Sequence, residues 1–425
     1  MSHPALSSLK RGLLFFLFII FISVGTYSQW TQQVSGTQEN LHTVYFINNS
    51  VGFLGSNIFT PPLIGGEIIR TSNGGDNWQR VLLDTNFRVE GFYFFDQNTG
   101  FAVGGSYSMV GYIYKTINGG LNWSNATPPN LTTHLFNIMF LNSITGYAGG
   151  SYGVVKTTDG GTNWTRVLTV TIYGIVSWGK IYFNDVNTGF FASDSGRVFK
   201  TINGGSVWTV SSLTSAAFRD IKFTDNNTGY IVGDNGVIFK TTNQGASWNL
   251  SNSGLSQNLF SVFFTDLNTG YITAEQTVLK TTNAGSNWFS VFSFGADSLF
   301  SSYFINANTG YTCGDEGRVY KTTTGGVIGI PPISTEVPKD FSLFQNYPNP
   351  FNPTTSIRFG IANESFVKLA VYDMLGREIE ILVNENLSPA TYEVKWNADK
   401  FSSGIYFYRI QADDYNDVKK MSVIK

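Results

Sequence analysis

Only three residues of this 425-residue chain are histidine and one is cysteine, so carboxylates are the main candidates for chemistry. Three carboxylates, Glu90, Asp220 and Glu275, could supply the acid and base of a glycoside hydrolase, which requires two carboxyl groups roughly 5–10 Å apart. His42 and His134 have no companion ligand motif, so we expect no metal site and no cofactor. These side chains lie far apart in the sequence, and only the fold can bring them together.

An internal repeat predicts the elements that would position them. Each copy holds a Lys or Arg, then Thr, then turn residues with Gly, and most copies close with Trp. The copies begin at Arg70, Lys115, Lys156, Lys200, Lys240, Lys280 and Lys321, so successive starts differ by 40 to 45 residues. A period near forty residues is the length of one four-stranded propeller blade. We therefore expect an all-β, seven-bladed propeller over residues 29–326.

Composition agrees with many short strands. The 45 glycines and the 16 % aromatic residues fit tight turns between short apolar strands. The net charge is −2, and no basic stripe stands out, so we expect no nucleic-acid partner. Cys313 is the single cysteine. An intrachain disulfide is therefore excluded, and we expect a buried structural thiol.

The first 28 residues have the parts of a secretory signal peptide. A basic pair, Lys10 and Arg11, precedes an uncharged apolar run over residues 12–24, and the small residues Thr26 and Ser28 suit cleavage after Ser28. The run is shorter than the ~20 apolar residues of a membrane-spanning helix, so we favour cleavage over an uncleaved anchor. No other segment is long and apolar enough to cross a membrane, so we do not expect an integral membrane protein.

A spare tryptophan predicts how the propeller closes. Six repeats end in Trp and the seventh, after Lys321, does not, whereas Trp30 follows the predicted cleavage site. We expect the mature N-terminus to supply the missing outer strand of the last blade. That arrangement removes two exposed sheet edges and ties the chain ends together.

The repeat also resembles known propeller families. Its Lys-to-Trp stretch resembles the Asp-box of sialidase-type propellers, best at Thr157, Asp159, Gly161 and Trp164. Residues 29–326 as a whole resemble the photosystem II assembly and stability factor type of propeller. These resemblances imply a fold, with a structural turn in each blade, and say little about function, because one fold hosts many unrelated sites.

Aligned inner strands place one residue of each blade near the mouth of the central channel. These residues are His42, Glu90, Phe136, Gly179, Arg219, Phe260 and Phe300. Three of the seven are ionisable where the others are not, which hints at a site, although solvated rim residues would give the same pattern. A sialidase is disfavoured, because it needs three convergent arginines and only Arg88 and Arg219 fall near this mouth.

The variable loops on the same face carry aromatic residues, which suit sugar stacking and protein contact. They include Phe59, Tyr107, Tyr152, Tyr173 and Trp178. As candidate ligand-binding residues we take His42, Glu90, Arg219, Phe59, Tyr107 and Trp178.

The last part of the chain is of a different kind. Residues 327–340 hold three prolines and indicate a linker. Residues 341–425 contain the block QNYPNPFNP, the segment VYDMLGRE, the strand GIYFYRI and a basic last strand. They closely resemble the C-terminal sorting domain (type A) of type IX secretion cargo. The motif residues are Asn346, Tyr347, Pro348, Asn349, Pro350, Phe351, Asn352, Pro353, Gly404, Lys419 and Lys420.

That resemblance implies an immunoglobulin-like β-sandwich and a route of export. The signal peptide would bring the protein to the periplasm, and the type IX secretion machinery would carry it across the outer membrane. A cell-surface sortase would then remove the domain, with release of the protein or its attachment to the surface.

Together these features favour a secreted or outer-surface propeller that binds an extracellular protein or glycan without catalysis. A carbohydrate-active hydrolase that uses the carboxylates at the channel mouth is one alternative. An assembly or stability factor for a membrane complex is another, by analogy with the photosystem propellers. The secretion module argues against that last role, because it would carry the protein past the periplasm.

Overall fold

The computed structural model describes most of the chain outside its N-terminal 29 residues. The described residues are 30–59, 64–129, 131–172, 175–176, 178–326, 332–334, 336–363, 365–387 and 389–425. The predicted signal peptide, residues 1–28, and Tyr173 lie outside them. Among the described residues, no helix has the length and hydrophobicity to cross a membrane.

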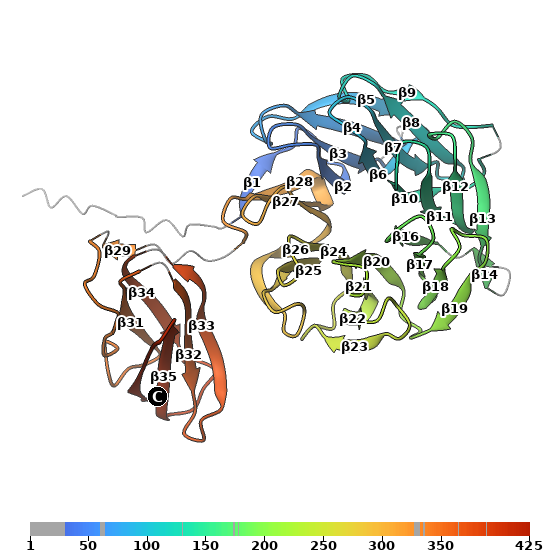
Figure 1. Ribbon diagram of the computed structural model, residues 1–425. Coiled ribbons are helices and arrows are strands. Elements are labelled where there is room, and N and C mark those ends of the chain that lie inside the picture. The colour runs from blue at the N-terminus through green and yellow to red at the C-terminus, as the bar shows by residue number, and fades with distance from the viewer. Residues whose placement is uncertain are drawn as a thin grey trace, which may run out of the picture.

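The chain is all-β, and its first part is a ring of four-stranded antiparallel meanders (Figure 1). Five separate sheets follow one another along the sequence, each with its strands in chain order. The first two sheets comprise β2 (Asn40–Phe46), β3 (Gly52–Asn57), β4 (Gly66–Thr71) and β5 (Gln79–Asp84), then β6 (Arg88–Phe94), β7 (Gly100–Gly105), β8 (Gly111–Thr116) and β9 (Ser124–Asn125). The next three comprise β10 (Leu135–Phe140), β11 (Gly146–Gly150), β12 (Gly153–Thr157) and β13 (Thr165–Thr169), then β16 (Gly179–Phe183), β17 (Gly189–Ser193), β18 (Arg197–Thr201) and β19 (Thr209–Ser212), then β20 (Phe218–Phe223), β21 (Gly229–Gly233), β22 (Val237–Thr241) and β23 (Asn249–Asn252). A short hairpin, β14 (Thr171–Ile172) and β15 (Ile175–Val176), lies between the third and fourth sheets.

A six-stranded sheet completes the ring. It comprises β24 (Leu259–Phe264), β25 (Gly270–Thr281), β26 (Phe289–Phe304), β27 (Gly310–Gly314), β28 (Arg318–Thr322) and β1 (Thr31–Val34). Strand β25 pairs first with β24 and then with β26, and β26 pairs first with β25 and then with β27. The pair Glu275↔Ser298 lies where both strands change partner. Because β25 and β26 each serve as two successive strands, this sheet contains the four-stranded pattern twice. Two short 3-10 turns, η1 (Asp234–Gly236) and η2 (Asp315–Gly317), precede β22 and β28.

The N-terminal strand closes the ring as the spare tryptophan predicted. Strand β1 pairs antiparallel with β28 in the register Thr31↔Lys321 to Val34↔Arg318. Trp30 is 1 % exposed and packs edge-on against Phe304, with ring centroids 6.0 Å apart. The same edge-on contact, at 5.8–6.1 Å, joins the last residue of each inner strand to a tryptophan in Phe46–Trp78, Phe94–Trp123, Phe140–Trp164, Phe183–Trp208, Phe223–Trp248 and Phe264–Trp288.

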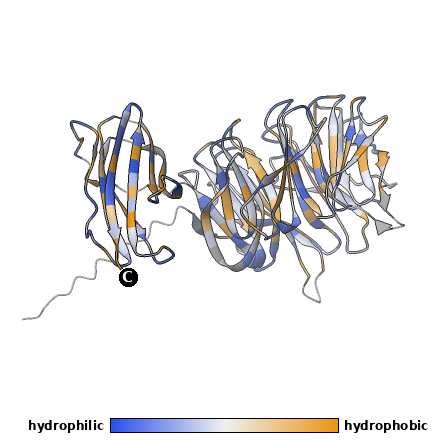
Figure 2. Cartoon of the chain, turned by 90° about the horizontal axis from the view of Figure 1, so that it is seen from below, coloured by the Kyte–Doolittle hydropathy of each residue, from blue (hydrophilic) through white to orange (hydrophobic). Residues whose placement is uncertain are grey.

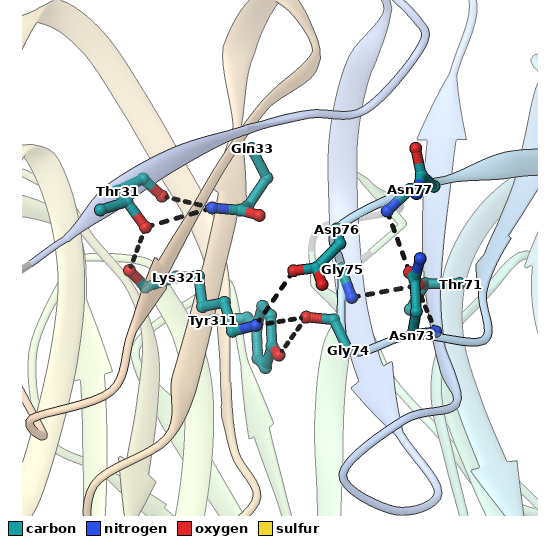
Figure 3. Close-up of polar contacts among 10 residues, drawn as sticks. All are labelled: Thr31, Gln33, Thr71, Asn73, Gly74, Gly75, Asp76, Asn77, Tyr311 and Lys321. Atoms are coloured by element: carbon teal, nitrogen blue, oxygen red, sulfur yellow. Dashed lines mark hydrogen bonds and ion pairs between the residues drawn. The ribbon is translucent and has the colours of Figure 1, made fainter.

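The repeated turn residues form hydrogen bonds within each meander. In the first copy, the backbone N–H of Gly75 donates to Oγ1 of Thr71 at 2.9 Å (Figure 3). The N–H of Asn77 donates to Oδ1 of Asn73 at 3.0 Å. Gly75 has a φ of 87°, a left-handed conformation that glycine adopts without steric cost.

The repeated basic residue has a role that its spacing did not predict. Nζ of Lys321 donates to the carbonyl of Gly74 in the neighbouring turn at 2.7 Å, and the hydroxyl of Tyr311 donates to the same carbonyl at 2.6 Å (Figure 3). We call this contact the latch. Equivalent latches run from Arg70, Lys156, Lys200, Lys240 and Lys280 to the carbonyls of Gly119, Gly204, Gln244, Ala284 and Gly325. Each latch joins one meander to the next.

The C-terminal part folds as two antiparallel four-stranded sheets. One comprises β29 (Pro332–Ser334), β34 (Ala390–Asn397), β31 (Thr354–Ile361) and β30 (Ser342–Leu343), and the other β33 (Glu378–Leu387), β32 (Ser365–Tyr372), β35 (Gly404–Ala412) and β36 (Tyr415–Val423). Side chains from both sheets, such as Ile357, Leu369, Trp396 and Tyr408, form one buried core. Hydrophobic and hydrophilic residues alternate along these strands (Figure 2), as expected for sheets with one buried face.

Candidate functional site

A β-bulge positions the candidate residue in six of the seven inner strands. The ladder between the first two strands of these meanders skips one residue, and the skipped residues are His42, Glu90, Phe136, Arg219, Phe260 and Phe300. Gly179, the seventh predicted equivalent, pairs regularly with Ser193 in a ladder without a bulge. A bulge leaves its extra residue unpaired and re-aims that side chain. We call the six bulged residues together with Trp178 the mouth ring.

Glu90 is the centre of a polar cluster in this ring. One of its carboxylate oxygens accepts a hydrogen bond from Nδ2 of Asn57 at 3.0 Å and lies 3.5 Å from Nη2 of Arg88. Nε2 of His134 is 3.5 Å from the same oxygen, and Nδ1 of His42 is 3.6 Å from the other. The side chain of Glu90 is only 8 % exposed. The sequence-predicted pair of His42 and Glu90 is therefore brought together, with three partners from β3, β6 and the segment before β10.

The electrostatics of the cluster favour an ionised Glu90. Burial opposes ionisation, but His42, His134 and Arg88 hold the pKa of this carboxyl well below its ordinary value. Burial lowers the pKa of His42, although Glu90 acts in the opposite direction. Near neutral pH, Glu90 is a carboxylate that can accept hydrogen bonds, and it is poorly suited to be a general acid, which needs a raised pKa.

Several buried polar atoms around Glu90 lack a hydrogen-bond partner within the part of the chain that the structure describes. They are Oδ1 of Asn57, Nε of Arg88 and Nδ1 of His134, whereas Nε2 of His134 faces Glu90. Asn57 and His134 are 0 % and 1 % exposed. Buried polar groups are nearly always satisfied in native proteins, so such a concentration calls for a bound water or ligand group.

Ring contacts extend the cluster on both sides of Glu90. His42 stacks on Phe300 with centroids 4.9 Å apart, and Phe300 meets Phe260 edge-on at 5.2 Å. In the other direction, His134 stacks on Phe136 at 4.7 Å. Phe136 in turn lies 5.4 Å from Trp178.

Arg219 ends this series of contacts. Its guanidinium lies 4.9 Å from the ring of Trp178 and forms two hydrogen bonds with Asp234, at 2.7 and 2.8 Å. The guanidinium is thus held in one orientation by an aromatic face and a carboxylate. Residues from six different inner strands therefore form one continuous series from Phe260 to Arg219.

The other loop aromatics differ in how they relate to the mouth ring. Phe59 is 45 % exposed, and the guanidinium of Arg88 lies 5.0 Å from its ring, so it joins the Glu90 cluster from the outside. Tyr107 is 71 % exposed in the turn between β7 and β8. Tyr107 makes no ring contact with the mouth ring among the described residues, so the structure does not bring it into this series.

The three carboxylates considered for hydrolysis occupy separate contacts. Asp220 accepts a hydrogen bond from the backbone N–H of Val262 at 3.0 Å and lies 3.6 Å from Nζ of Lys180. Glu275 accepts a hydrogen bond from Nδ2 of Asn258 at 2.9 Å. Neither contacts Glu90 directly in the described part of the chain. Within those residues, no group of three His, Cys, Asp or Glu side chains is placed to hold a metal ion.

The sequence did not point to every member of the cluster. His134 was considered only as a metal ligand, and its position two residues before Phe136 was the available signal. Asn57 ends a fully buried second strand, where no pattern distinguished it. Cys313 is buried and free, as expected, and burial raises the pKa of its thiol.

The QNYPNPFNP block is an ordered segment that holds the last strand. Asn346 is 2 % exposed, and its side-chain amide donates to Oγ1 of Thr355 at 2.9 Å. Phe351 is buried edge-on against Trp396, with centroids 5.6 Å apart. The N–H of Phe351 donates to the carbonyl of Ser422, and Oδ1 of Asn349 accepts from the N–H of Ser422 at 2.9 Å.

The remaining motif residues lie on the surface around that last strand. Tyr347 is 81 % exposed, and Pro348, Pro350, Asn352 and Gly404 are also exposed, while Pro353 is half-buried. Lys419 and Lys420 lie on β36, where Lys419 is 3.4 Å from Asp417 and Lys420 is exposed. The block therefore combines two buried anchors, Asn346 and Phe351, with exposed residues that lie beside the basic strand β36.

Comparison with known proteins assigns both parts of the chain. The family described as photosynthesis system II assembly factor YCF48 matches residues 70–212 and 209–327, more than half of the chain. The family described as secretion system C-terminal sorting domain matches residues 345–425. A C-terminal domain of this kind implies export by the type IX secretion system, to the cell surface or the medium.

Individual relatives agree with this division. The photosystem II assembly lipoprotein Ycf48 of Synechococcus sp. (strain CC9902) is 30 % identical over 153 residues, which are 34 % of this chain and 43 % of the relative. The chain thus matches less than half of that relative's length. The structure of YCF48 bound to a D1 peptide superposes with a TM-score of 0.57 at 18 % identity, covering 70 % of this chain and 98 % of that one.

A second structural neighbour comes from a type IX secretion system. PorZ of Porphyromonas gingivalis, a surface component of that system, superposes with a TM-score of 0.52 at 12 % identity. The match covers 91 % of this chain and 60 % of PorZ. Both structural likenesses concern the fold alone. The chain belongs to the photosynthesis system II assembly factor YCF48 family, and it ends in a secretion system C-terminal sorting domain.

Proposed function

We propose that this protein is a secreted or surface-displayed binding module whose mouth ring takes an extracellular protein or glycan without catalysis. In this proposal a signal peptide, residues 1–28, precedes a seven-bladed propeller, residues 29–326, that its N-terminal strand closes. A linker, residues 327–340, leads to an immunoglobulin-like sorting domain, residues 341–425. The type IX machinery recognises that domain, and a surface sortase processes it.

One observation carries the binding role. The seven members of the mouth ring are of five residue types, His, Glu, Phe, Trp and Arg, although the meanders are otherwise built alike. With His134 between Glu90 and Phe136, they touch in series from Phe260 to Arg219. Aromatic faces beside a fixed carboxylate and a fixed guanidinium are the composition of a recognition site. Two buried atoms without a partner among the described residues, Oδ1 of Asn57 and Nδ1 of His134, support the same role, because a ligand hydroxyl or an ordered water would satisfy them.

A non-catalytic role fits the geometry better than hydrolysis. The low pKa of Glu90 removes the obvious general acid, and Asp220 and Glu275 are held by contacts of their own. The assembly role of the Ycf48 relative is a second candidate. Export through the sorting domain disfavours it, since it would separate the protein from the inner membrane.

Binding can be tested with a ring variant. The mature protein would be applied to a glycan array and used in a pull-down from intact cell surfaces. We expect a specific partner that is lost in Trp178→Ala combined with Phe300→Ala. Ile202→Ala removes a 71 % exposed apolar side chain from a repeated turn and serves as the matched control. A partner that binds the ring variant as well as the wild type would refute the proposed site.

Export can be tested separately at the sorting domain. Phe351→Ala removes a side chain that is 3 % exposed, which typically costs ~3–5 kcal/mol. We expect the variant to be lost from the surface and to accumulate in the periplasm, whereas Ile405→Ala, at an exposed position of the same domain, leaves export unchanged. Surface display of the Phe351 variant at the wild-type level would contradict the proposed role of the block.

A further inference from the structure

A second layer of side chains lies three residues after the mouth position of each inner strand, which is the bulged residue or, in β16, Gly179. We call it the belt, and its members are Tyr45, Tyr93, Met139, Tyr182, Lys222, Phe263 and Tyr303. All seven are half-buried on the strands closest to the centre of the ring (Figure 1). Six are neutral and mostly aromatic, so Lys222 is the single charge in the belt.

The ammonium of Lys222 has no anionic or carbonyl partner among the described residues. Nζ lies 5.4 Å from the ring of Tyr182 and 5.6 Å from the ring of Phe263, the belt residues on either side of it. The nearest carboxylate in sequence, Asp220, is engaged by Lys180 and by the N–H of Val262. Burial lowers the pKa of Lys222, and Asp220 only partly offsets this effect.

The latch lysines show what a structural lysine in this fold does. Lys240 also lies over a tyrosine ring, 5.5 Å from Tyr230, but its Nζ donates to the carbonyl of Ala284 at 2.6 Å. Lys222 has the aromatic contacts without the acceptor. Burying an unpaired charge is costly, and the other belt residues show that a neutral side chain fills the same position.

We propose that Lys222 binds the carboxylate of an acidic sugar residue whose ring is held by the mouth ring. The inference rests on the proposed binding function and specifies its ligand class. Arg219 precedes Lys222 by three residues on β20, and Asp234 already pairs with the guanidinium of Arg219, so Lys222 carries the unpaired cation next to the mouth ring. The aromatic members of the mouth ring offer faces for the C–H surface of a sugar, and Glu90 and Asn57 offer acceptors for its hydroxyls.

A pair of probes that differ only in charge tests this ligand class. Binding of trigalacturonate and of its fully methyl-esterified, neutral form to the mature protein would be measured by titration calorimetry. We expect the acid to bind at least tenfold more tightly than the ester. We also expect Lys222→Met to remove that difference. Lys339→Met, an equal charge change at an exposed linker position, should leave it intact.

Each other outcome overturns the inference and leaves the binding function to its own test. Equal affinity for acid and ester would mean that the ring binds sugars without reading charge. Undiminished acid binding by Lys222→Met would place the anion elsewhere. Absence of binding by both probes would reject the ligand class, while the array and pull-down still decide the binding function. A peptide with a free C-terminal carboxylate would also be compared with its amide. If the free acid binds more tightly and the sugar acid does not bind, the ligand is a peptide and an acidic sugar is the wrong class. Should Lys222→Met fail to fold, Lys222→Gln is the second variant, with the same expectation.

Discussion

The latches and the mouth ring both recur at equivalent places around the ring, but their contacts differ. At the latches, a cation and a carbonyl recur in nearly the same geometry around the ring, with donor distances of 2.6–2.9 Å. At the mouth, equivalent positions hold histidine, glutamate, arginine, phenylalanine or glycine. Uniform contacts stabilise a repeated interface. In a repeat protein, ligand specificity comes from positions that are equivalent in the backbone but differ in side chain.

Loss of the contact that closes the ring should lower the stability more than any other change considered. Deletion of residues 29–36 removes β1 and the buried Trp30, and it exposes the edge of β28. Loss of a buried tryptophan alone costs about 3–5 kcal/mol, so we expect the melting temperature to fall sharply. Thermal unfolding followed by circular dichroism measures this change. Val34→Ala, at an 83 % exposed position of the same strand, is the control, and an unchanged melting curve for the deletion would reject closure as a source of stability.

Glu90 should be the most costly single residue to change at the mouth. In Glu90→Gln, Arg88 and the histidines lose a buried anionic partner, and breaking such a pair costs about 3 kcal/mol. The pKa of Glu90 is lower in the folded protein than its unfolded value of about 4.3. The stabilisation by its charge is therefore complete above that pH and is lost as the pH falls towards the folded pKa.

The penalty of Glu90→Gln should therefore be large at pH 7 and should shrink below pH 4. Urea unfolding at the two pH values measures it. The same substitution at Glu316, whose side chain is 69 % exposed, should change stability little at either pH. An equal penalty at both pH values would show that shape and packing, and not the charge, make Glu90 costly to replace.

The uniform part of the molecule was predictable from the sequence and the variable part was not. The seven copies of one phrase predict the meanders, and the displaced Trp30 predicts the pairing of β1 with β28. The alignment of inner strands also grouped the six positions that the structure shows to be bulged, together with Gly179, which is not, because the same register slip recurs in most copies. It could not show that His134 and Asn57 converge on Glu90, since those contacts cross between meanders and leave no periodic trace.

The sorting domain shows the same division between motif and contact. Its block of asparagines and prolines is recognisable in sequence, and the match over residues 345–425 agrees. The sequence does not show that Asn346 and Phe351 are buried anchors while Tyr347 between them is exposed. That division depends on how the block crosses the last strand, which is a property of the folded sheets.

Two lysines that differ in their partners test the difference between the latches and the belt, and they give the smallest expected effect. Lys240→Met removes a latch hydrogen bond to the carbonyl of Ala284, and we expect it to lower the free energy of unfolding by about 1–2 kcal/mol. Lys222→Met loses aromatic contacts worth about 0.5–2 kcal/mol but also relieves an unpaired, partly desolvated charge. We expect the free energy of unfolding to change by less than about 0.5 kcal/mol in that variant.

Both variants lose one positive charge and gain the same side chain, so urea unfolding of the pair separates a lysine retained for stability from one retained for binding. If Lys222→Met proves as destabilising as Lys240→Met, the belt lysine is a structural residue, and the distinction between the uniform and variable rings no longer extends to the belt.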